Sequence, residues 1–123
     1  MKVLVTGGHG QLGTALALQE SKHEIILCNH EELNIEDRSS ITQAMAFYRP
    51  DTVINCAAWT NVDDCEQASD KAFNVNGHAV GLLRETTEEF GSQLVQISTD
   101  YVFDGEKNSS YEETDSPNPL NVY

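Results

Sequence analysis

Short apolar runs alternate along the chain with longer segments in which apolar residues recur every third or fourth position. The short runs have the length and character of strands covered on both faces; they are Lys2–Thr6, Glu24–Cys28, Thr52–Cys56 and Gln93–Ser98. The longer segments have a helical period; they lie at Gln11–Glu20, Arg38–Tyr48 and Gln67–Phe90. This alternation predicts βαβ units and therefore an α/β fold with a parallel sheet.

The connections between these elements constrain the topology. Right-handed crossovers in a doubly wound sheet predict the strand order 3-2-1-4, with ligands bound at the carboxyl ends of the strands. Beyond the turn signal Asp104-Gly105, the segment Glu106–Pro119 is polar and contains two prolines, which predicts a surface loop. Four strands form only part of a doubly wound sheet, so the predicted fold is incomplete.

A glycine-rich segment, Thr6–Gly13, joins the first predicted strand to the first predicted helix and fits both GxGxxG and GxxGxxG spacing. Small residues there allow a tight turn, close approach of the backbone to a pyrophosphate, and close packing of helix on strand. The helix that follows directs its first N–H groups at the anion. This context predicts a dinucleotide site in a Rossmann-type domain, and the alternative is a structural turn that binds nothing.

The residue that would contact the adenosine ribose follows the second predicted strand. An acidic residue at this place favours NAD, whereas a nearby arginine accommodates the extra phosphate of NADP. The chain has Asn29 there, followed by His30, Glu31 and Glu32. Asparagine tolerates either ribose, while the two glutamates would repel a phosphate, so the choice between NADH and NADPH stays open. His30 is interpreted as an exposed loop residue.

The charge and cysteine content exclude several classes of partner. Seven Lys plus Arg stand against 20 Asp plus Glu, a net charge of −13, which argues against nucleic acids and anionic membranes. No apolar run is long enough to span a membrane. Cys28, Cys56 and Cys65 form no paired framework, which favours reduced thiols in the cytoplasm. The four histidines lack metal-ligand spacing, so no metal site is expected.

Several motifs, taken in order, resemble the extended short-chain dehydrogenases/reductases, and within them the dTDP-4-dehydrorhamnose reductase family. The resemblance covers Val3 to Tyr123, and its segments are Thr6–Gly13, Val53–Asp63, Ala72–Asn76, Ser98–Gly105 and Asn118–Tyr123. The discriminating one is Ser98–Gly105, because epimerases and dehydratases of the wider family more often carry a Ser-Ser-x-x-Val-Tyr-Gly type there. Residues 1–123 would then be the N-terminal part of an NAD(P)-binding Rossmann domain.

The resemblance implies roles for individual residues. Tyr123 would belong to a Tyr-x-x-x-Lys pair and protonate the C4 oxygen of the sugar, Thr99 would hydrogen-bond that oxygen, and Asp100 would lie against the substrate. A phenol has a pKa of about 10, so neighbouring positive charge must lower it for work near neutral pH. Other residues would contact NADPH or NADH. Gly10, Gln11 and Leu12 would hold the pyrophosphate, with Gly7 and Gly13 in the turn. Asn29 would contact the ribose, Asn34 and Ile35 would flank the adenine, and Ala58, Trp59 and Thr60 would line the inner half of the cofactor.

The implied activity is NAD(P)H-dependent reduction of dTDP-4-dehydro-β-L-rhamnose in dTDP-rhamnose synthesis, by a cytoplasmic enzyme that forms a homodimer at full length. The lysine due at position 127 and the substrate domain lie outside the 123 residues, so the chain alone is expected to show no turnover. Two alternatives stay open. One is a non-catalytic NADP-binding subunit resembling the methionine adenosyltransferase beta subunit, and the other is a reductase or epimerase acting on a different sugar nucleotide.

Overall fold

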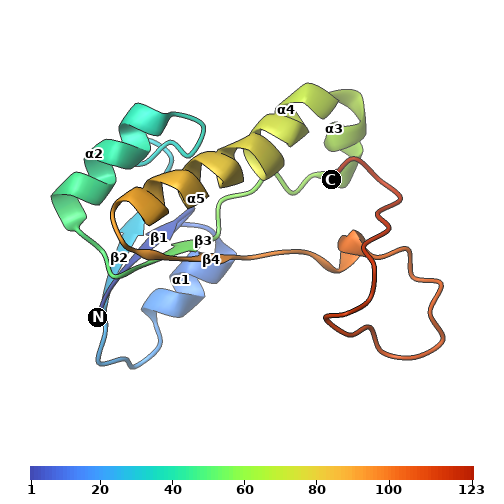
Figure 1. Ribbon diagram of the computed structural model, residues 1–123, viewed down its shortest axis with the longest axis horizontal. Helices are drawn as coiled ribbons and strands as arrows, with labels where there is room; N and C mark the ends of the chain where they lie inside the picture. Colours follow the sequence, from blue (N-terminus) through green and yellow to red (C-terminus); the bar gives the residue numbers. More distant parts are fainter.

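The computed structural model describes residues 1–123 and contains one parallel sheet with helices on both faces (Figure 1). Its strands are β1 (Lys2–Thr6), β2 (Glu24–Cys28), β3 (Thr52–Asn55) and β4 (Gln93–Gln96). The α/β class, the parallel sheet and the positions of all four strands confirm the sequence prediction. The two later strands end before the predicted Cys56 and Ser98, because the chain turns away from the sheet toward the site there.

The order of the strands corrects the prediction. The sheet runs β2-β1-β3-β4, and β3 pairs with β1, with Val5 opposite Ile54, on the side of β1 away from β2. The predicted order 3-2-1-4 is therefore wrong, because no strand lies outside β2. The segment after β2 forms a loop and not a crossover to a strand beyond β2. The chain instead crosses back to the other side of β1, so the direction in which strands are added reverses after β2 and not after β3. A reversal at β1 and β3 places the topological switch point, where ligands bind in such sheets, directly at the glycine segment.

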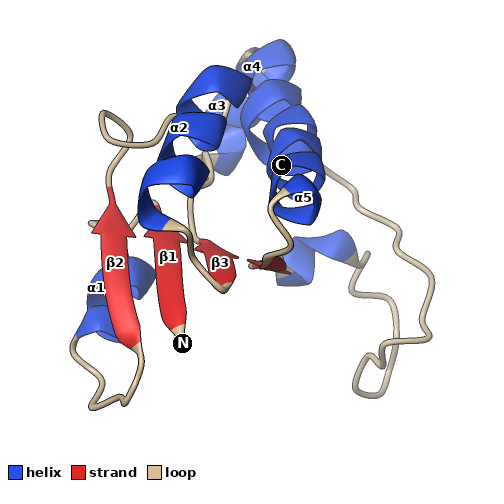
Figure 2. Ribbon diagram, turned by 60° about the vertical axis from the view of Figure 1, so that its left-hand side comes forward, coloured by secondary structure: helices blue, strands red, loops and turns tan.

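Helices cover the two faces of the sheet unequally (Figure 2). Helix α1 (Gln11–Ala17) lies on one face, while α2 (Arg38–Tyr48) and α5 (Ala79–Glu89) pack side by side over the other. The predicted helix Gln67–Phe90 corresponds to α4 (Ser69–Phe73), a π-helical turn (Asn74–His78) and α5. A separate short helix, α3 (Val62–Gln67), precedes it and was not predicted; the non-helical backbone of Ala68 divides the two.

The core lies between the sheet and the α2/α5 layer. Leu4 of β1 and Val53 of β3 are adjacent in the sheet and are both fully buried. The helical period of α2 places Ile41 and Met45 on the face that meets them, and Leu83 of α5 completes the contact. The loop after β2 adds Leu33 and Ile35 to this core. Strands β1 and β3 are thereby packed against one layer of helices. Their carboxyl ends lie outside this core and are available for a binding site.

Helix ends in this layer follow ordinary capping chemistry. Asp37 caps α2 by accepting a hydrogen bond from the N–H of Ser39, and α2 ends at Arg49, whose φ of 47° is left-handed, just before Pro50. Asn61 caps α3 in the same way through the N–H of Asp64. A short 3-10 helix, Asp100–Val102, follows β4, and the predicted surface loop then runs to the C-terminal residues. No helix has the length and apolar character needed to cross a membrane.

Candidate functional site

The glycine segment packs tightly against both neighbours of β1. Gly7 has a φ of +60°, and a Cβ there would lie 2.8 Å from the Cα of Ala57, just beyond β3. On the other side, the N–H of Gly8 donates to the carbonyl of Cys28 at 2.9 Å. A Cβ on Gly13 would overlap the Gly8 carbonyl, so α1 approaches the turn only because residue 13 is glycine. The three positions thus serve close packing, as the sequence predicted.

The start of α1 has the donors that an anion needs. Gly10 is the N-cap residue, and no side chain caps the helix. Gln11 and Leu12 are exposed at the first turn, while Gly13 is buried beneath them. A pyrophosphate placed here would meet unpaired backbone N–H groups. The donor set therefore fits a dinucleotide phosphate at the residues predicted to hold it.

The loop after β2 is ordered by its own side chains. Asn29 Oδ1 accepts hydrogen bonds from the N–H groups of Glu31 and Glu32, at 2.8 and 3.0 Å. Glu32 Oε2 in turn accepts from the N–H of Asn29 at 2.9 Å. This reciprocal pair fixes the carboxylate of Glu32 next to the residue predicted to contact the ribose. His30 is exposed.

The two residues predicted to flank the adenine differ in what they can offer. Asn34 is half-buried; its Oδ1 accepts from the N–H of Glu36, and its own N–H donates to Ser40 Oγ, each at 3.0 Å. Ile35 is only 4% exposed and its side chain belongs to the core. An adenine contact by Ile35 would therefore have to come from its main chain.

A buried asparagine links the ends of three strands, and the sequence analysis assigned it no role of its own. Asn55 is fully buried at the end of β3, and its Oδ1 accepts from the hydroxyl of Thr6 on β1 and from the N–H of Ala57. Its Nδ2 donates to Gln96 Oε1 on β4 at 2.7 Å. This one amide thus connects the last residues of β1, β3 and β4, next to the glycine turn and to the segment after β4.

The segment after β3 passes from Ala57 to Thr60 across the carboxyl edge of the sheet. Asn76, in the π-helical turn, accepts from the Trp59 N–H and donates to the Trp59 carbonyl, both at 2.9 Å. The ammonium of Lys71 lies 4.3 Å from the centroid of the Trp59 ring. Ala58 is exposed and lines the pocket described next, and Thr60 is also exposed. Sequence reasoning missed Asn76, although it is a polar residue within an otherwise apolar helical stripe.

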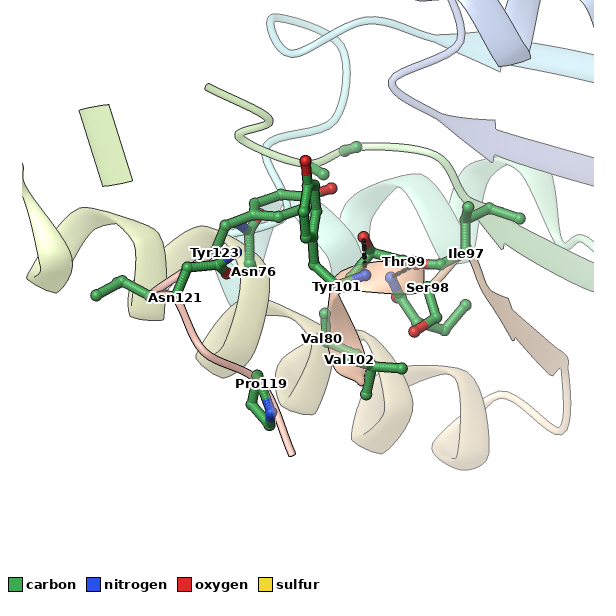
Figure 3. Close-up of a pocket in the computed structure, with 14 residues that line it drawn as sticks. Asn76, Val80, Ile97, Ser98, Thr99, Tyr101, Val102, Pro119, Asn121 and Tyr123 are labelled. Atoms are coloured by element: carbon green, nitrogen blue, oxygen red, sulfur yellow. Dashed lines mark hydrogen bonds between the residues drawn. The ribbon is translucent and has the colours of Figure 1, made fainter. Parts of the chain in front are cut away.

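A pocket of about 280 Å³ lies where β3, β4 and the C-terminal segment meet (Figure 3). It brings together residues far apart in the sequence, among them Ala58, Asn76, Thr99, Tyr101 and Tyr123. Figure 3 shows Tyr101 and Tyr123 standing together near Asn76, with Thr99 beside them. The structure therefore places both predicted catalytic side chains, Thr99 and Tyr123, on the wall of one cavity.

Thr99 and Asp100 follow β4, and Thr99 lines this pocket. Thr99 Oγ1 accepts from the N–H of Tyr101 at 3.2 Å, so it caps the 3-10 helix. The same hydroxyl lies 3.3 Å from Asp100 Oδ1 and donates to it. Asp100 is exposed and is not among the residues that line the pocket. The sequence prediction of a substrate contact for Asp100 would need a ligand that extends beyond the cavity.

Tyr123 is positioned by contacts on two sides. Its ring meets that of Tyr101 edge to face, with centroids 6.2 Å apart. The N–H of the preceding Val122 donates to Glu66 Oε1 of α3 at 2.7 Å. Asn121 also lines the pocket, and its buried Oδ1 has no hydrogen-bond partner within the chain. Neither Glu66 nor Asn121 carried a signal in the sequence, because their partners lie in distant segments.

The cysteines offer no nucleophile to this pocket. Burial raises the pKa of the Cys56 thiol, which follows β3. Burial also raises the pKa of Cys65 in α3, and the neighbouring Asp64 and Glu66 add to the effect. Thiols with raised pKa values carry little thiolate near neutral pH. The chemistry of the site therefore rests on hydroxyl and amide groups.

The comparisons with known proteins agree with this geometry. The Bacillus subtilis spore coat polysaccharide biosynthesis protein SpsK is 41% identical over 99% of this chain and 44% of its own length. A dTDP-4-dehydrorhamnose reductase of Burkholderia thailandensis is 40% identical over 100% of this chain and 42% of its own. The Bacillus anthracis dTDP-4-dehydrorhamnose reductase, solved in complex with NADP, superposes with a TM-score of 0.95 at 35% identity, covering 99% of this chain and 44% of that one.

This chain therefore spans less than half the length of the relatives that it matches. The sequence model of one family, described as the RmlD substrate binding domain, matches residues 1–123. The chain belongs to the RmlD substrate binding domain family.

Proposed function

We propose that this chain is the dinucleotide-binding part of an oxidoreductase that reduces dTDP-4-dehydro-β-L-rhamnose to dTDP-L-rhamnose with NADPH or NADH. The observation that carries the proposal is the single pocket wall shared by Thr99 and Tyr123, adjacent to the glycine segment across Ala57 and Ala58. Similar chains named dTDP-4-dehydrorhamnose reductase, one of them solved with NADP, support it. A cytoplasmic location and a homodimer at full length belong to the same proposal.

In this proposal the glycine turn and the start of α1 hold the pyrophosphate. The backbone N–H groups of Gln11, Leu12 and Gly13 would bind its oxygens, with Gly10 as the N-cap residue of the helix. Ala58, Trp59 and Thr60 would line the inner half of the cofactor, with Trp59 held in place by Asn76. When bound, the reduced nicotinamide supplies the hydride.

The hydroxyl groups in the pocket perform the proton chemistry. With substrate bound, Thr99 Oγ1 would turn its single proton from Asp100 Oδ1 to the C4 oxygen of the sugar and polarise the carbonyl. The phenolic Oη of Tyr123 would give its proton to that oxygen as the alcohol forms. Asp100, exposed and outside the pocket lining, would contact the part of the substrate that projects from the cavity.

Two experiments test the proposal. The chain alone is expected to bind a reduced dinucleotide but not to oxidise it in the presence of dTDP-4-dehydro-β-L-rhamnose, because its relatives use more than twice its length. A chimaera in which this chain replaces the matching segment of the Burkholderia thailandensis reductase is expected to oxidise the cofactor and to produce dTDP-L-rhamnose.

The Tyr123→Phe variant of the chimaera is the matched test of mechanism. Loss of a positioned proton donor lowers the turnover number by about 10²- to 10⁴-fold. Tyr111→Phe is the control, because Tyr111 is bound to Asp104 in the surface loop, away from the pocket lining. A folded chimaera that binds the dinucleotide but reduces no sugar nucleotide would contradict the proposed reaction and favour a non-catalytic binding role.

A further inference from the structure

We propose that this site binds NADH in preference to NADPH and that the carboxylate of Glu32 sets the preference. This inference rests on the proposed dinucleotide-binding function and adds the identity of the cofactor. It follows from where the loop after β2 lies and from which charges surround it.

The loop after β2 is the direct neighbour of the glycine turn. The hydrogen bond from the Gly8 N–H to the Cys28 carbonyl, 2.9 Å long, joins the turn to the last residue of β2. Asn29 is the next residue, so a dinucleotide that lies on the turn brings its adenosine ribose to Asn29. In sheets of this kind the residue at the end of the second strand contacts the ribose hydroxyls.

Asn29 itself does not distinguish the two cofactors. Its Oδ1 is already bonded to the N–H groups of Glu31 and Glu32. The groups that remain for a ligand are the Nδ2 donors, which suit a ribose hydroxyl oxygen and a phosphate oxygen alike. Any discrimination must therefore come from the charge that surrounds Asn29.

That charge is negative and fixed in place. Glu32 Oε2 accepts the N–H of Asn29 at 2.9 Å, which holds the carboxylate beside the ribose position. The extra phosphate of NADPH carries between about −1.5 and −2 charges near neutral pH, so it would lie close to a like charge. The 2′-hydroxyl of NADH is a neutral group that can donate to the same carboxylate.

No free cation on the adjoining helix offsets the repulsion. Arg38, at the start of α2, directs its guanidinium to Glu85 and Glu89 of α5, with N···O distances of 2.7 and 2.6 Å. These two carboxylates raise the pKa of Arg38, and each accepts a hydrogen bond from one of its terminal nitrogens. The guanidinium of Arg38 is thus paired with α5 and is not directed at the loop after β2.

The test is an equilibrium titration of the chain with NADH and with NADPH, followed by the fluorescence of the reduced nicotinamide. A competition series with ADP-ribose and its 2′-phosphate isolates the adenosine half. At low ionic strength NADH is expected to bind about tenfold more tightly than NADPH, and added salt should reduce the difference.

Glu32→Gln is the diagnostic variant, because glutamine keeps an oxygen acceptor for the Asn29 N–H and removes only the charge. It is expected to raise the affinity for NADPH by about tenfold and to change that for NADH by less than about twofold. Glu31→Gln is the matched control, since Glu31 is the exposed neighbour whose side chain is not held beside Asn29. It should leave the ratio of the two affinities nearly unchanged.

Three outcomes would overturn the inference. Equal or tighter binding of NADPH by the unchanged chain removes the preference, while the proposed function stands. Equal effects of the Glu31 and Glu32 variants remove the specific role of Glu32. Failure to bind either dinucleotide would overturn the proposed function together with this inference.

Discussion

The side-chain amide of Asn76 bridges both main-chain polar groups of Trp59, with one hydrogen bond to the N–H and one to the carbonyl, each 2.9 Å long. Asn76 occupies the π-helical turn between α4 and α5, a local irregularity that often marks a functional site. The turn directs this side chain to the segment after β3, so one amide binds both main-chain groups of Trp59, the residue next to the pocket-lining Ala58.

Replacing Asn76 with alanine is expected to destabilise the fold by about 1–3 kcal/mol, because the Trp59 N–H loses its acceptor and the Trp59 carbonyl keeps only the weak donor of the Cys65 thiol. Urea unfolding monitored by the fluorescence of Trp59, the single tryptophan, measures the change. Asn74→Ala is the control, because Asn74 is exposed in the same turn. Equal stabilities of the two variants would show that the bridge contributes nothing.

Some glycines of this chain lie where a Cβ would overlap neighbouring atoms, and others lie where a Cβ would meet only open space. Gly13→Ala is expected to destabilise the chain and to abolish dinucleotide binding, because the added Cβ overlaps the Gly8 carbonyl and pushes α1 off the turn. The added Cβ would meet main-chain atoms, which cannot move aside as a flexible side chain can. We therefore expect overpacking to lower the free energy of unfolding by about 1–3 kcal/mol. Thermal unfolding and an NADH titration measure the two effects.

Gly81→Ala is the matched control for this substitution. Gly81 lies within α5, and a Cβ there would meet nothing within 4 Å. Alanine should therefore stabilise the helix by about 0.5–1 kcal/mol and leave binding unchanged. A Gly13→Ala chain that binds NADH as well as the Gly81→Ala chain does would refute the packing argument.

The sequence predicted local elements well because their signals are local. The bounds of β1, β2 and α2 agree with the apolar runs and the helical period that predicted them. The strand order was mispredicted because periodicity does not say on which side of β1 a strand pairs. The loop with Leu33 and Ile35 illustrates the difficulty: its alternating apolar residues enter the core without forming a strand.

The sequence predicted those parts of the candidate site whose strand, turn and helix are contiguous along the chain. It did not predict the residues whose hydrogen-bond partners are distant in the sequence. The glycine turn could be recognised because strand, turn and helix are contiguous. Asn55 bonds Gln96, which is 41 residues away, and Asn76 bonds Trp59, which is 17 residues away. No local pattern distinguishes such an asparagine from one that faces solvent, because its role depends on tertiary packing.

Asn55 gives a third prediction, on the stability of the sheet at the carboxyl ends of its strands. Asn55→Ala should cost about 1–3 kcal/mol, because Thr6 and the Ala57 N–H lose a buried acceptor and Gln96 loses a donor. Gln93→Ala, at an exposed position of β4, should change stability by less than about 0.5 kcal/mol. Denaturant unfolding of both variants measures the difference, and similar midpoints would exclude a structural role for Asn55.

The loop beyond Phe103 gives the fourth prediction, a dependence on pH. The Glu106 N–H, the Asn118 amide and the Tyr111 hydroxyl all donate to Asp104 and lower its pKa below the ordinary 3.8. The Lys107 ammonium and the Glu112 N–H likewise lower the pKa of Asp115. Because the folded pKa values lie below the unfolded ones, these contacts stabilise the loop fully above pH 3.8 and are lost as the pH falls through the folded values.

Nuclear magnetic resonance can follow this loss through the amide protons that donate to the two carboxylates. The Glu106 amide should shift in a single step centred below pH 3.8, and the Glu112 amide should behave similarly. Asp104→Asn should remove the step at Glu106 while the step at Glu112 persists, because Asp115 keeps its contact with Lys107. Glu113→Gln, in the same loop but exposed, should alter neither step. A Glu106 step centred above pH 3.8 would mean that the carboxylate of Asp104 does not hold the loop.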